Sequence, residues 1–449
     1  MSSPWPPGSL DNEAWLRRSL ASVWHPCTQM KQHEWLPLIP IARAQGVWLY
    51  DFDGRRYLDA IGSWWVNLFG HGHPHIKARI AAQLDRLEHV LLAGFTHAPV
   101  VELSERLASL APGDLGHCFY ASDGASATEV ALKMSFHFWR NTGVPEKTRF
   151  ISLEHSYHGE TLGALSVTDV ALFRDTYAAL LRAADTVPSP DWRLARAGTS
   201  PLDHALACAA ALEQRLEQRH RETAALILEP LVQCAAGMAM YHPEYLRQAR
   251  ALCDRYGVHL IADEIAVGFG RTGTLFACEQ AGIVPDFLCL SKGITGGYLP
   301  LSVVLTTPAI YDAFYADETA RGFLHSHSYT GNPLACSAAL ATLELFDRDD
   351  VIEANRAKAR TLARLTEPIV AHPRVQHFRS TGMIWAFDVV TEDPAFARRF
   401  CAEALQRELL LRPIGTTVYF MPAYVIDEAE LALLCERTLE ALEAATAAG

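Results

Sequence analysis

The sequence predicts an α/β fold in which a large domain with a mostly parallel sheet is joined to a smaller α+β domain. Between residues 117 and 335, apolar runs of about four to seven residues alternate with helical patterns, which is typical of parallel strands buried on both faces. The chain has 449 residues and is half hydrophobic, enough for more than one domain. We expect residues 1–66 and 341–449 to form the smaller domain and residues 67–340 the large one, which binds the cofactor inferred below.

The N-terminal part is predicted to begin with a helix and to continue into turn-rich strands. Residues 11–23 fit a short helix. In the segment GVWLYDFDGRRYLDA, the pair Asp53-Gly54 is typical of a β-hairpin turn. Over residues 76–91 the apolar side chains recur at intervals of three and four, which predicts an amphipathic helix over that whole range.

The remainder of the chain supplies the strands of the large domain and then a mixed tail. The predicted buried parallel strands are RFISLE, ALILEPL, VHLIADEI, DFLCLSK and LSVVLTT. Beyond residue 340, two long helical patterns flank VQHFRSTGMIWAFDVV, and YFMPAYV and a last helix follow. This tail is therefore expected to join the N-terminal part in the α+β domain.

Composition excludes several classes of protein. The 39 basic and 51 acidic residues give a net charge of -12, and no Lys/Arg run occurs, so no nucleic-acid partner is expected. No apolar run approaches the roughly 18 residues of a membrane span, and the N-terminus has no secretory pattern. The ten cysteines are scattered singly, without a C-x-x-C pair. We expect a cytoplasmic protein with reduced thiols and no membrane partner.

The most informative polar residues end two neighbouring predicted strands. Asp263 ends the apolar run of VHLIADEI, and Lys292 ends that of DFLCLSK. Ligands of open α/β sheets lie beyond the carboxyl ends of strands, so both side chains are expected in one crevice. A desolvated lysine can form a Schiff base, and an aspartate can hold a pyridinium nitrogen protonated, which is what pyridoxal phosphate needs. Singly, each residue has a plainer reading, as a solvent-directed lysine or a loop cap; the pairing favours the cofactor.

A candidate phosphate site precedes this pair. The segment CFYASDGASATEVALKMSFHFW passes from a predicted strand through small residues, including Gly124 and Ala125, into a helix. Free backbone N–H groups and the helix dipole at such a start attract an anion. An ordinary helix N-cap has the same sequence, so the segment indicates a phosphate site only together with the Lys292 and Asp263 pair.

Two other patterns are not assigned a ligand. GFGRTG at residues 268–273 fits G-x-G-x-x-G, but acidic residues interrupt the strand before it and no helical pattern follows, so a dinucleotide site is not expected. In HGHPH at residues 71–75, a proline turn that enters a helix separates the rings, and we expect no carboxylate partner beside them. We expect turn and cap histidines there, and no metal.

The sequence resembles a known family, the class III (subgroup II) aminotransferases, which are pyridoxal-phosphate enzymes of fold type I. The motifs that carry this resemblance are LILEP (226–230), LIADEIAVGFGRTG (260–273), PDFLCLSKGITGG (285–297) and HSYTGNPLACSAAL (327–340). Motifs similar to the members that act in biotin synthesis are WHPCTQM (24–30), GSWWVNLFGHGHP (62–74), HSYHGETLGALSVT (155–168) and LLLRPIGTTVYFMPAY (409–424). The likeness covers nearly the whole chain.

The resemblance implies the roles of the cofactor-site residues. Lys292 matches the Schiff-base lysine, and Asp263 matches the partner of the pyridine nitrogen. Tyr157 matches the aromatic residue that stacks on the cofactor ring and touches the substrate, so these three residues are expected to be catalytic. The residues that match phosphate contacts are Gly124 and Ala125, with His327 and Ser328 supplied by a neighbouring subunit.

The resemblance also implies a substrate site, to which Tyr157 and Lys292 contribute. Trp64 matches the aromatic wall of the substrate pocket, and Ser326 matches a backbone contact. Arg412 matches the guanidinium that receives the substrate carboxylate, for which a planar fork suits better than lysine. The alternatives are that Trp64 is a core aromatic and that Arg412 lies in a surface loop.

The implied reaction is a ping-pong transamination in which 8-amino-7-oxononanoate becomes 7,8-diaminononanoate, with S-adenosylmethionine as amino donor and a homodimer with shared active sites. Lys292 is expected to act as nucleophile and as general acid and base. Two residues depart from the family pattern. Cys27 stands where many members have a tyrosine that places the donor, which leaves lysine open as an alternative donor. His327-Ser328 stands where other members have Pro-Thr. Another ω-amino acid or diamine transaminase of the same family is the alternative function.

Overall fold

The computed structural model describes residues 11–447, and this part of the chain divides into two compact units. The first unit contains the chain up to His73, residues 360–378 and the chain from Phe387 onward. The second contains residues 74–359 and 379–386. Both ends of the described chain thus belong to the first unit. The predicted lack of a secretory pattern concerns, in part, residues 1–10, which lie outside the described range.

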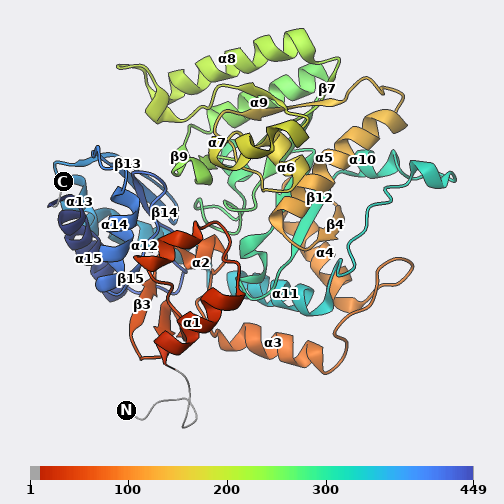
Figure 1. Ribbon diagram of the computed structural model, residues 1–449. Coiled ribbons are helices and arrows are strands. Elements are labelled where there is room, and N and C mark those ends of the chain that lie inside the picture. The colour runs from red at the N-terminus through yellow and green to blue at the C-terminus, as the bar shows by residue number, and fades with distance from the viewer. Residues whose placement is uncertain (1–10, 448–449) are drawn as a thin grey trace. The chain divides into compact units, whose positions relative to one another are not determined.

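The second unit is built on a seven-stranded sheet with the order β4-β12-β11-β10-β7-β5-β6. Three of these strands, β4, β12 and β7, are labelled in Figure 1. Its strands are β4 (His117–Ala121), β5 (Arg149–Leu153), β6 (Asp185–Val187), β7 (Thr223–Leu228), β10 (His259–Asp263), β11 (Phe287–Leu290) and β12 (Ser302–Thr306). The pairs from β11 through β10, β7 and β5 to β6 are parallel. The predicted mostly parallel sheet and its five apolar strands are therefore confirmed.

The expected parallel orientation of LSVVLTT is wrong, because β12 runs antiparallel to both β11 and β4. Residues 291–301 alone connect β11 to β12. They form the short 3-10 helix η6 (Lys292–Thr295) and a turn in which Gly296 and Gly297 have φ of 62 and 88. A parallel connection needs a dozen or more residues, usually with a helix, so this link can only reverse the chain.

Helix α5 (Gly124–Asn141) packs on the centre of this sheet. Its buried side chains, among them Ala127 and Val130, form one cluster with Ile227, Ile261 and Phe287 of three successive strands. The apolar strand runs thus meet an apolar helix face, which fixes the helix start beside the carboxyl ends of the strands. The further helices of this unit are α4 (Ala98–Leu110), α6 (Leu162–Val167), α7 (Ala171–Arg174), α8 (Pro201–Arg219), α9 (Glu244–Tyr256) and α10 (Pro308–Asp312), with a small hairpin β8 (Val232–Gln233) and β9 (Ala239–Met240).

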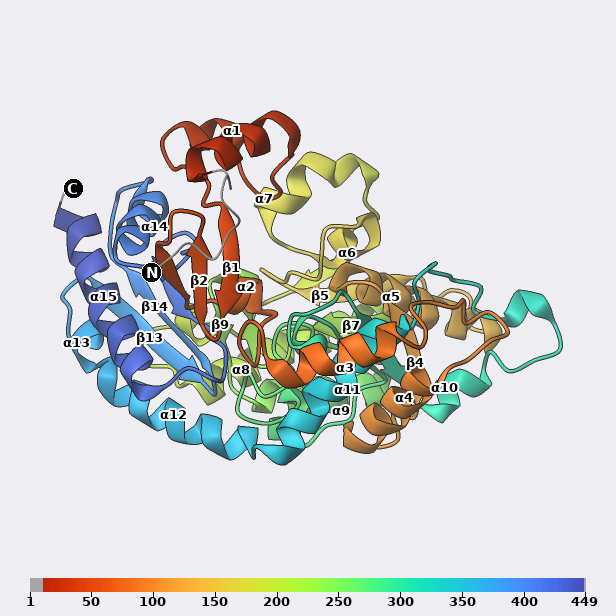
Figure 2. The ribbon, with the colours of Figure 1, turned by 90° about the horizontal axis from the view of Figure 1, so that it is seen from below.

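The helix predicted over residues 76–91 is shorter in the structure. Helix α3 spans Pro74–Leu84 and packs along α11 (Pro333–Arg348), which also contacts α4 (Figure 2). Beyond it the chain turns, with Leu87 N donating to Gln83 O at 2.9 Å. Leu84 and Leu91 remain more than half exposed, at 57% and 51%. The apolar spacing in the sequence therefore continues past the end of the helix, but the side chains that follow it there are not packed into a core.

The predicted N-terminal helix and hairpin are confirmed in the first unit. Helix α1 spans Asn12–Ser22, and the Asp11 carboxylate caps it by accepting from Ala14 N at 2.8 Å. Strands β2 (Trp48–Asp51) and β3 (Arg56–Asp59) pair antiparallel around Gly54, whose φ of 87 favours glycine.

Two sheets organise the remaining strands. The first has the order β1-β2-β3-β15, with β1 at Ile41–Gln45 and β15 at Leu409–Leu410, and the second has the order β13-β14-β16. The remaining elements are α2 (Gly62–Trp65), α12 (Val351–Leu365), α13 (Glu367–Val370), β13 (Val375–Thr381), β14 (Ile384–Val389), α14 (Phe396–Gln406), β16 (Thr417–Phe420) and α15 (Glu428–Ala447). The mixed tail predicted from the sequence is present.

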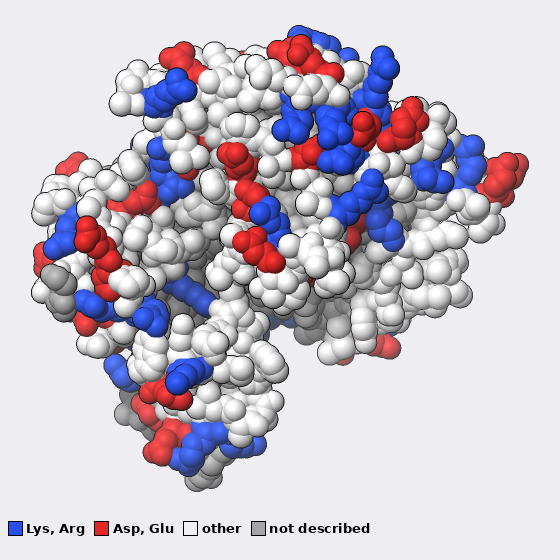
Figure 3. Space-filling model, turned by 45° about the horizontal axis from the view of Figure 1, so that its top comes forward, with Lys and Arg blue, Asp and Glu red and all other residues white. Residues whose placement is uncertain are grey.

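The surface carries both signs of charge, with acidic and basic side chains interspersed on the face shown in Figure 3. Among residues 11–447, no helix has both the length and the apolar character that a bilayer crossing requires. All ten cysteines, which lie in the described range, are free thiols.

Candidate active site

Asp263 and Lys292 lie at the same end of two adjacent parallel strands. Asp263 is the last residue of β10, opposite Cys289 of β11, and Lys292 begins η6 two residues after β11 ends. Burial lowers the pKa of Lys292, and the nearby charges of Asp263 and Glu229 oppose that shift. The amine is therefore desolvated beside acidic groups, an environment suited to a lysine nucleophile.

The backbone at Lys292 is strained. Its φ is 45, in the left-handed region that non-glycine residues adopt at a cost of about 1–2 kcal/mol. The flanking chain holds this conformation, because Ser291 Oγ donates to Leu301 O at 2.8 Å and the reversal closes against β12. Strain of this kind is common where a side chain must point in one direction for function.

Asp263 is held by two groups. One of its oxygens, Oδ1, accepts from Ile265 N at 3.0 Å, and the other, Oδ2, lies 2.6 Å from Nδ1 of His158. Both side chains are buried. Because a carboxylate only accepts, Nδ1 of His158 carries the proton in this bond. The aspartate is thus fixed in orientation by the histidine and one backbone N–H.

Sequence reasoning assigned Tyr157 but missed the adjacent His158. The residue lies in the quoted SYHG motif, yet nothing in its spacing indicates that it reaches a strand more than a hundred positions away. Its Nε2 is buried without a hydrogen-bond partner among the described residues. The one available signal was that a histidine follows a residue already assigned to the cofactor.

Glu229 is a second functional candidate that sequence reasoning missed, although the LILEP motif contains it. Its buried carboxylate accepts from Tyr157 N at 3.1 Å and from Cys234 N at 3.2 Å. Burial raises the pKa of Glu229 well above its usual range, and the charge of Asp263 adds to the increase, whereas these backbone bonds and Lys292 lower it. Glu229 therefore ties the Tyr157 loop to the Asp263 and Lys292 pair.

The predicted phosphate turn is the first turn of α5. The Asp123 carboxylate caps the helix by accepting from Ser126 N at 2.9 Å. The N–H groups of Gly124 and Ala125 belong to the first turn, where a helix offers no internal acceptor. A Cβ on Gly124 would lie 2.8 Å from Ile265 Cγ2, so only glycine permits this approach of helix and strand end. The cradle suits an anion held by backbone donors.

Gly159 brings the SYHG motif against the same turn. Its φ is 121, and a Cβ there would lie 2.5 Å from the Cβ of Ala125. Tyr157 is half-buried, with its hydroxyl donating to Glu160 Oε1 at 2.9 Å and its ring 5.4 Å from that of Phe173. Residues from the two sequence motifs therefore pack together, as one site requires.

The predicted contacts at positions 326–328 lie in the loop that precedes α11. Ser326 and Ser328 are exposed and His327 is half-buried. His327 Nε2 lies 3.0 Å from Nε2 of His325. This loop belongs to the second unit, together with Lys292, Asp263, Tyr157 and the phosphate turn.

Trp64 and Arg412 lie together in the first unit. The guanidinium of Arg412 lies 5.1 Å from the Trp64 ring centroid, and its Nη2 donates to the backbone oxygen of Cys27 at 3.0 Å. Trp64 is 45% exposed, so it is not a core aromatic. The structure thus brings together three positions that the sequence motifs kept far apart.

An unusual turn presents Trp64. The φ values of Gly62, Ser63, Trp64 and Trp65 are 54, 47, 69 and 74, which makes α2 a single left-handed turn. The carboxylate of Asp59 stabilises it by accepting from Ser63 N at 2.9 Å and from Ser63 Oγ at 2.7 Å. Three consecutive non-glycine residues in this conformation are costly, which indicates that the turn serves to place a side chain.

Among residues 11–447, no group of three metal-ligating side chains is placed to hold a metal ion. The expectation that no carboxylate stands beside the HGHPH histidines is wrong. His71 Nε2 lies 3.1 Å from Asp59 Oδ2, and His75 Nε2 lies 2.6 Å from Glu344 Oε2. Both carboxylates come from other elements, so each ring has a single acidic partner that its sequence neighbourhood did not reveal.

Comparison with known proteins connects this geometry to a family. The family model described as Aminotransferase class-III matches residues 29–442. The chain is 48% identical over 420 residues to the adenosylmethionine-8-amino-7-oxononanoate aminotransferase of Helicobacter pylori, covering 92% of this chain and 94% of that protein.

Solved structures agree with this match. The crystal structure of the enzyme of the same name from Methanocaldococcus jannaschii is 33% identical, with a TM-score of 0.91 and coverage of 96% of this chain and 99% of that chain. The ω-transaminase of Pseudomonas jessenii in complex with PMP is 27% identical, with a TM-score of 0.92 and coverage of 96% and 98%. The sequence match and the shared fold show that the chain belongs to the class III aminotransferases, which are pyridoxal-phosphate-dependent transaminases.

Proposed function

We propose that this aminotransferase binds pyridoxal phosphate and converts 8-amino-7-oxononanoate to 7,8-diaminononanoate in biotin synthesis, with S-adenosylmethionine as amino donor. The observation that carries the proposal is the pair formed by buried Asp263 and half-buried Lys292, which lie where two adjacent parallel strands end. The names of the relatives from H. pylori and M. jannaschii support the choice of substrates.

The residues of the second unit fit a phosphorylated pyridine aldehyde. Lys292 would hold it through Nζ, and Asp263 would hold the ring nitrogen protonated. Gly124 and Ala125 would donate backbone N–H groups to the phosphate, and Tyr157 would stack on the ring. When bound, this cofactor supplies an electron sink for the bond at the substrate carbon.

The chain itself supplies the proton transfer. The Lys292 amine would take a proton from the donor Cα in the first half-reaction and deliver one to the carbon that is aminated in the second. Its lowered pKa leaves a larger fraction in the basic form at neutral pH than an exposed lysine would have. His158 keeps Asp263 oriented throughout, because its bond to Oδ2 does not involve the substrate.

The residues of the first unit fit the substrate side. The Trp64 ring offers a flat apolar surface for the hydrocarbon chain of the oxo acid, and the Arg412 guanidinium offers a planar fork for its carboxylate. The bond from Arg412 Nη2 to Cys27 O orients this fork, and within residues 11–447 no carboxylate forms an ion pair with it. Ser326 would contribute a backbone contact.

We also propose a cytoplasmic homodimer with shared active sites, in which His327 and Ser328 of the partner subunit complete the phosphate contacts. The ten free thiols are consistent with a reducing compartment. Light scattering at micromolar concentration would measure the mass. A monomer that retains its cofactor and its activity would contradict the shared site.

The donor is tested by a half-reaction titration. Holoenzyme is mixed with S-adenosylmethionine or with lysine, without acceptor, and the visible cofactor spectrum is followed. We expect S-adenosylmethionine to bleach the spectrum and lysine to leave it unchanged. Bleaching by lysine alone would show that lysine is the amino donor. This alternative is tested because Cys27 stands where many members of the family have the tyrosine that places S-adenosylmethionine.

The acceptor is tested by adding 8-amino-7-oxononanoate or pyruvate to the bleached enzyme. Recovery of the spectrum with the oxo acid, and formation of 7,8-diaminononanoate detected by mass spectrometry, are the expected results. Recovery with pyruvate alone would instead favour the second candidate function, that of an ω-transaminase. The ω-transaminase of P. jessenii has the same fold as this chain.

A further inference from the structure

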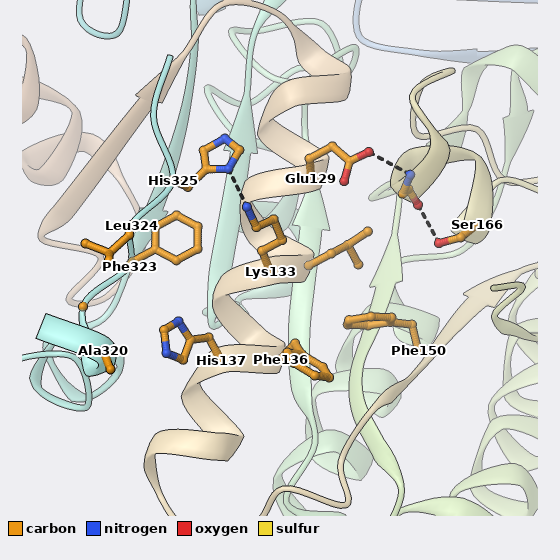
Figure 4. A pocket seen from close by; sticks show the side chains of 13 residues that line it. Glu129, Lys133, Phe136, His137, Phe150, Ser166, Ala320, Phe323, Leu324 and His325 are labelled. Carbon is orange, nitrogen blue, oxygen red and sulfur yellow. Dashed lines mark hydrogen bonds between the residues drawn. The ribbon is translucent and has the colours of Figure 1, made fainter. Parts of the chain in front are cut away.

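Three side chains outside the pair of Asp263 and Lys292 form a chain of hydrogen bonds in the second unit. Lys133 of α5 lies with Nζ 2.7 Å from Nδ1 of His325 (Figure 4). The other ring nitrogen of His325, Nε2, lies 3.0 Å from Nε2 of His327. We call these three residues the histidine relay. It connects the middle of α5 to the loop residue that the proposed function assigns to a phosphate contact.

The direction of each bond follows from what each atom can donate. An ammonium group has three donors and no acceptor, so His325 Nδ1 must accept from Lys133. His325 is then neutral, with its proton on Nε2, and that proton can only be donated to Nε2 of His327. An acceptor at Nε2 leaves His327 neutral as well, with its proton on Nδ1.

The surroundings of His325 favour this assignment. Its ring stacks on Phe323, with centroids 5.6 Å apart and planes 20° apart, which restricts rotation. Burial lowers the pKa of His325, the charge of Lys133 lowers it further, as would a second proton on His327, and Glu129 opposes the shift. These are the groups that α5 and the loop direct at the ring, and their balance keeps it uncharged.

We propose that Lys133 and His325 are positioning residues that hold His327 as the neutral Nδ1–H tautomer, so that it offers the cofactor phosphate one uncharged donor. The tautomer follows from the relay alone, whereas the phosphate as its target rests on the proposed function. Without the relay, neither Lys133 nor His325 would select the Nδ1–H tautomer, and His327 would offer that donor to the phosphate for only part of the time.

The outer end of the relay borders open space. Lys133 and His325 both line a cavity of about 450 Å³, together with Phe136, Phe150 and Phe323 (Figure 4). A substitution at Lys133 therefore changes a side chain at the edge of this cavity and not one in the packed core.

The tautomers are tested by nitrogen-15 NMR of histidine-labelled holoenzyme at pH 7. The two rings are identified by the spectra of His325→Phe and His327→Asn. We expect both rings to be neutral, with the proton on Nε2 of His325 and on Nδ1 of His327. In Lys133→Met this pattern should be lost, and in Lys133→Arg, which keeps a donor, it should be retained. A charged ring in the wild type, or an unchanged pattern in Lys133→Met, would overturn the proposal.

The effect on the phosphate is tested by the rate of cofactor release from the holoenzyme at pH 7. In Lys133→Met, release should be several-fold faster than in the wild type, because the Nδ1–H donor of His327 is no longer selected. Lys77→Met, which removes an exposed charge from α3, is the matched control and should follow the wild type. Equal release rates for Lys133→Met and the wild type would overturn the positioning role.

A further variant separates this inference from the proposed function. His327→Asn should speed cofactor release several-fold if His327 contacts the phosphate. If the tautomers are as stated but His327→Asn releases the cofactor at the wild-type rate, the phosphate contact is overturned while the relay stands. Neither readout depends on which amine donor the enzyme uses.

Discussion

The two buried carboxylates beside Lys292 differ from the residues assigned to the substrate pocket in how completely the protein itself fixes them. Asp263 and Glu229 are nearly inaccessible, at 4% and 6% exposed, and backbone N–H groups and one histidine occupy their oxygens. Trp64 is 45% exposed, and exposed Arg412 is held by one backbone oxygen and a ring face. The first group is organised by its hydrogen bonds, and the second by the backbone that presents it.

This difference has a physical origin. Buried charges are tolerated only when they are paired and hydrogen-bonded, so the cofactor-side group needs a complete set of partners in the folded chain. Side chains in contact with water have no such requirement. For such side chains, the fold mainly determines the direction in which they point. The left-handed turn Gly62–Trp65 determines this direction for Trp64.

The largest expected effect concerns Lys292, whose charged form the nearby carboxylates of buried Asp263 and Glu229 favour. Lys292→Ala should lose the visible absorbance of the bound cofactor and essentially all turnover, because the alanine side chain can act neither as nucleophile nor as base. Absorbance spectra and steady-state assays measure both. Thermal unfolding should show that the variant still folds. A variant that keeps its absorbance and turnover would remove Lys292 from the mechanism.

The next effect tests whether the partners of the buried group matter. His158→Phe removes the donor to Asp263 Oδ2, a hydrogen bond to a charged group that contributes about 2 kcal/mol, so turnover should fall about thirtyfold. The pH dependence of the cofactor absorbance should shift as well. His158→Asn, whose amide can replace Nδ1, should recover part of both. Equal losses in the two variants would point to packing instead of positioning.

The exposed group should respond differently. Arg412→Ala is expected to raise the KM for the oxo acid roughly ten- to a hundredfold, with a much smaller effect on the donor, because a charge-assisted fork to the carboxylate is lost. Arg412→Lys should be intermediate, since a point charge cannot make both bonds. Similar changes for both substrates would show that the carboxylate contact is misassigned.

The smallest effect concerns the turn that presents Trp64. Asp59→Asn should lower the free energy of unfolding by about 1–2 kcal/mol, because its carboxylate accepts from Ser63 N and Ser63 Oγ. Urea denaturation followed by circular dichroism measures this loss. Ser63→Ala, which removes only the hydroxyl, should cost less. If Asp59→Asn is as stable as the wild type, the carboxylate is not what holds the left-handed turn.

Much of the fold was predictable because local patterns carried it. Asp263 could be recognised from the apolar run that precedes it, and the start of α5 from its small residues. The direction of β12 was not visible in LSVVLTT, since it depends on the short connection that precedes it. The end of α3 at Leu84 was missed because apolar spacing continued where burial did not.

The residues of the candidate site could be predicted where a single sequence motif contains them. The contacts of His158 with Asp263 and of Glu229 with Tyr157 join segments that are distant in the sequence. No regular spacing of residues predicts such contacts. The left-handed turn was also hidden, because its sequence contains two tryptophans and a serine, which rarely adopt positive φ. Whether the assigned residues bind cofactor and substrate stays a prediction for the experiments above.

The reversal between β11 and β12 has a consequence for how the chain reaches its native state. Contacts between residues close in sequence form at a low entropic cost, whereas parallel pairings must close long loops first. Lys292 lies in the local hairpin of this sheet, between two strands that pair directly with each other. We therefore expect the segment that carries the lysine to be among the earlier parts of the sheet to form, before any ligand is available to shape it.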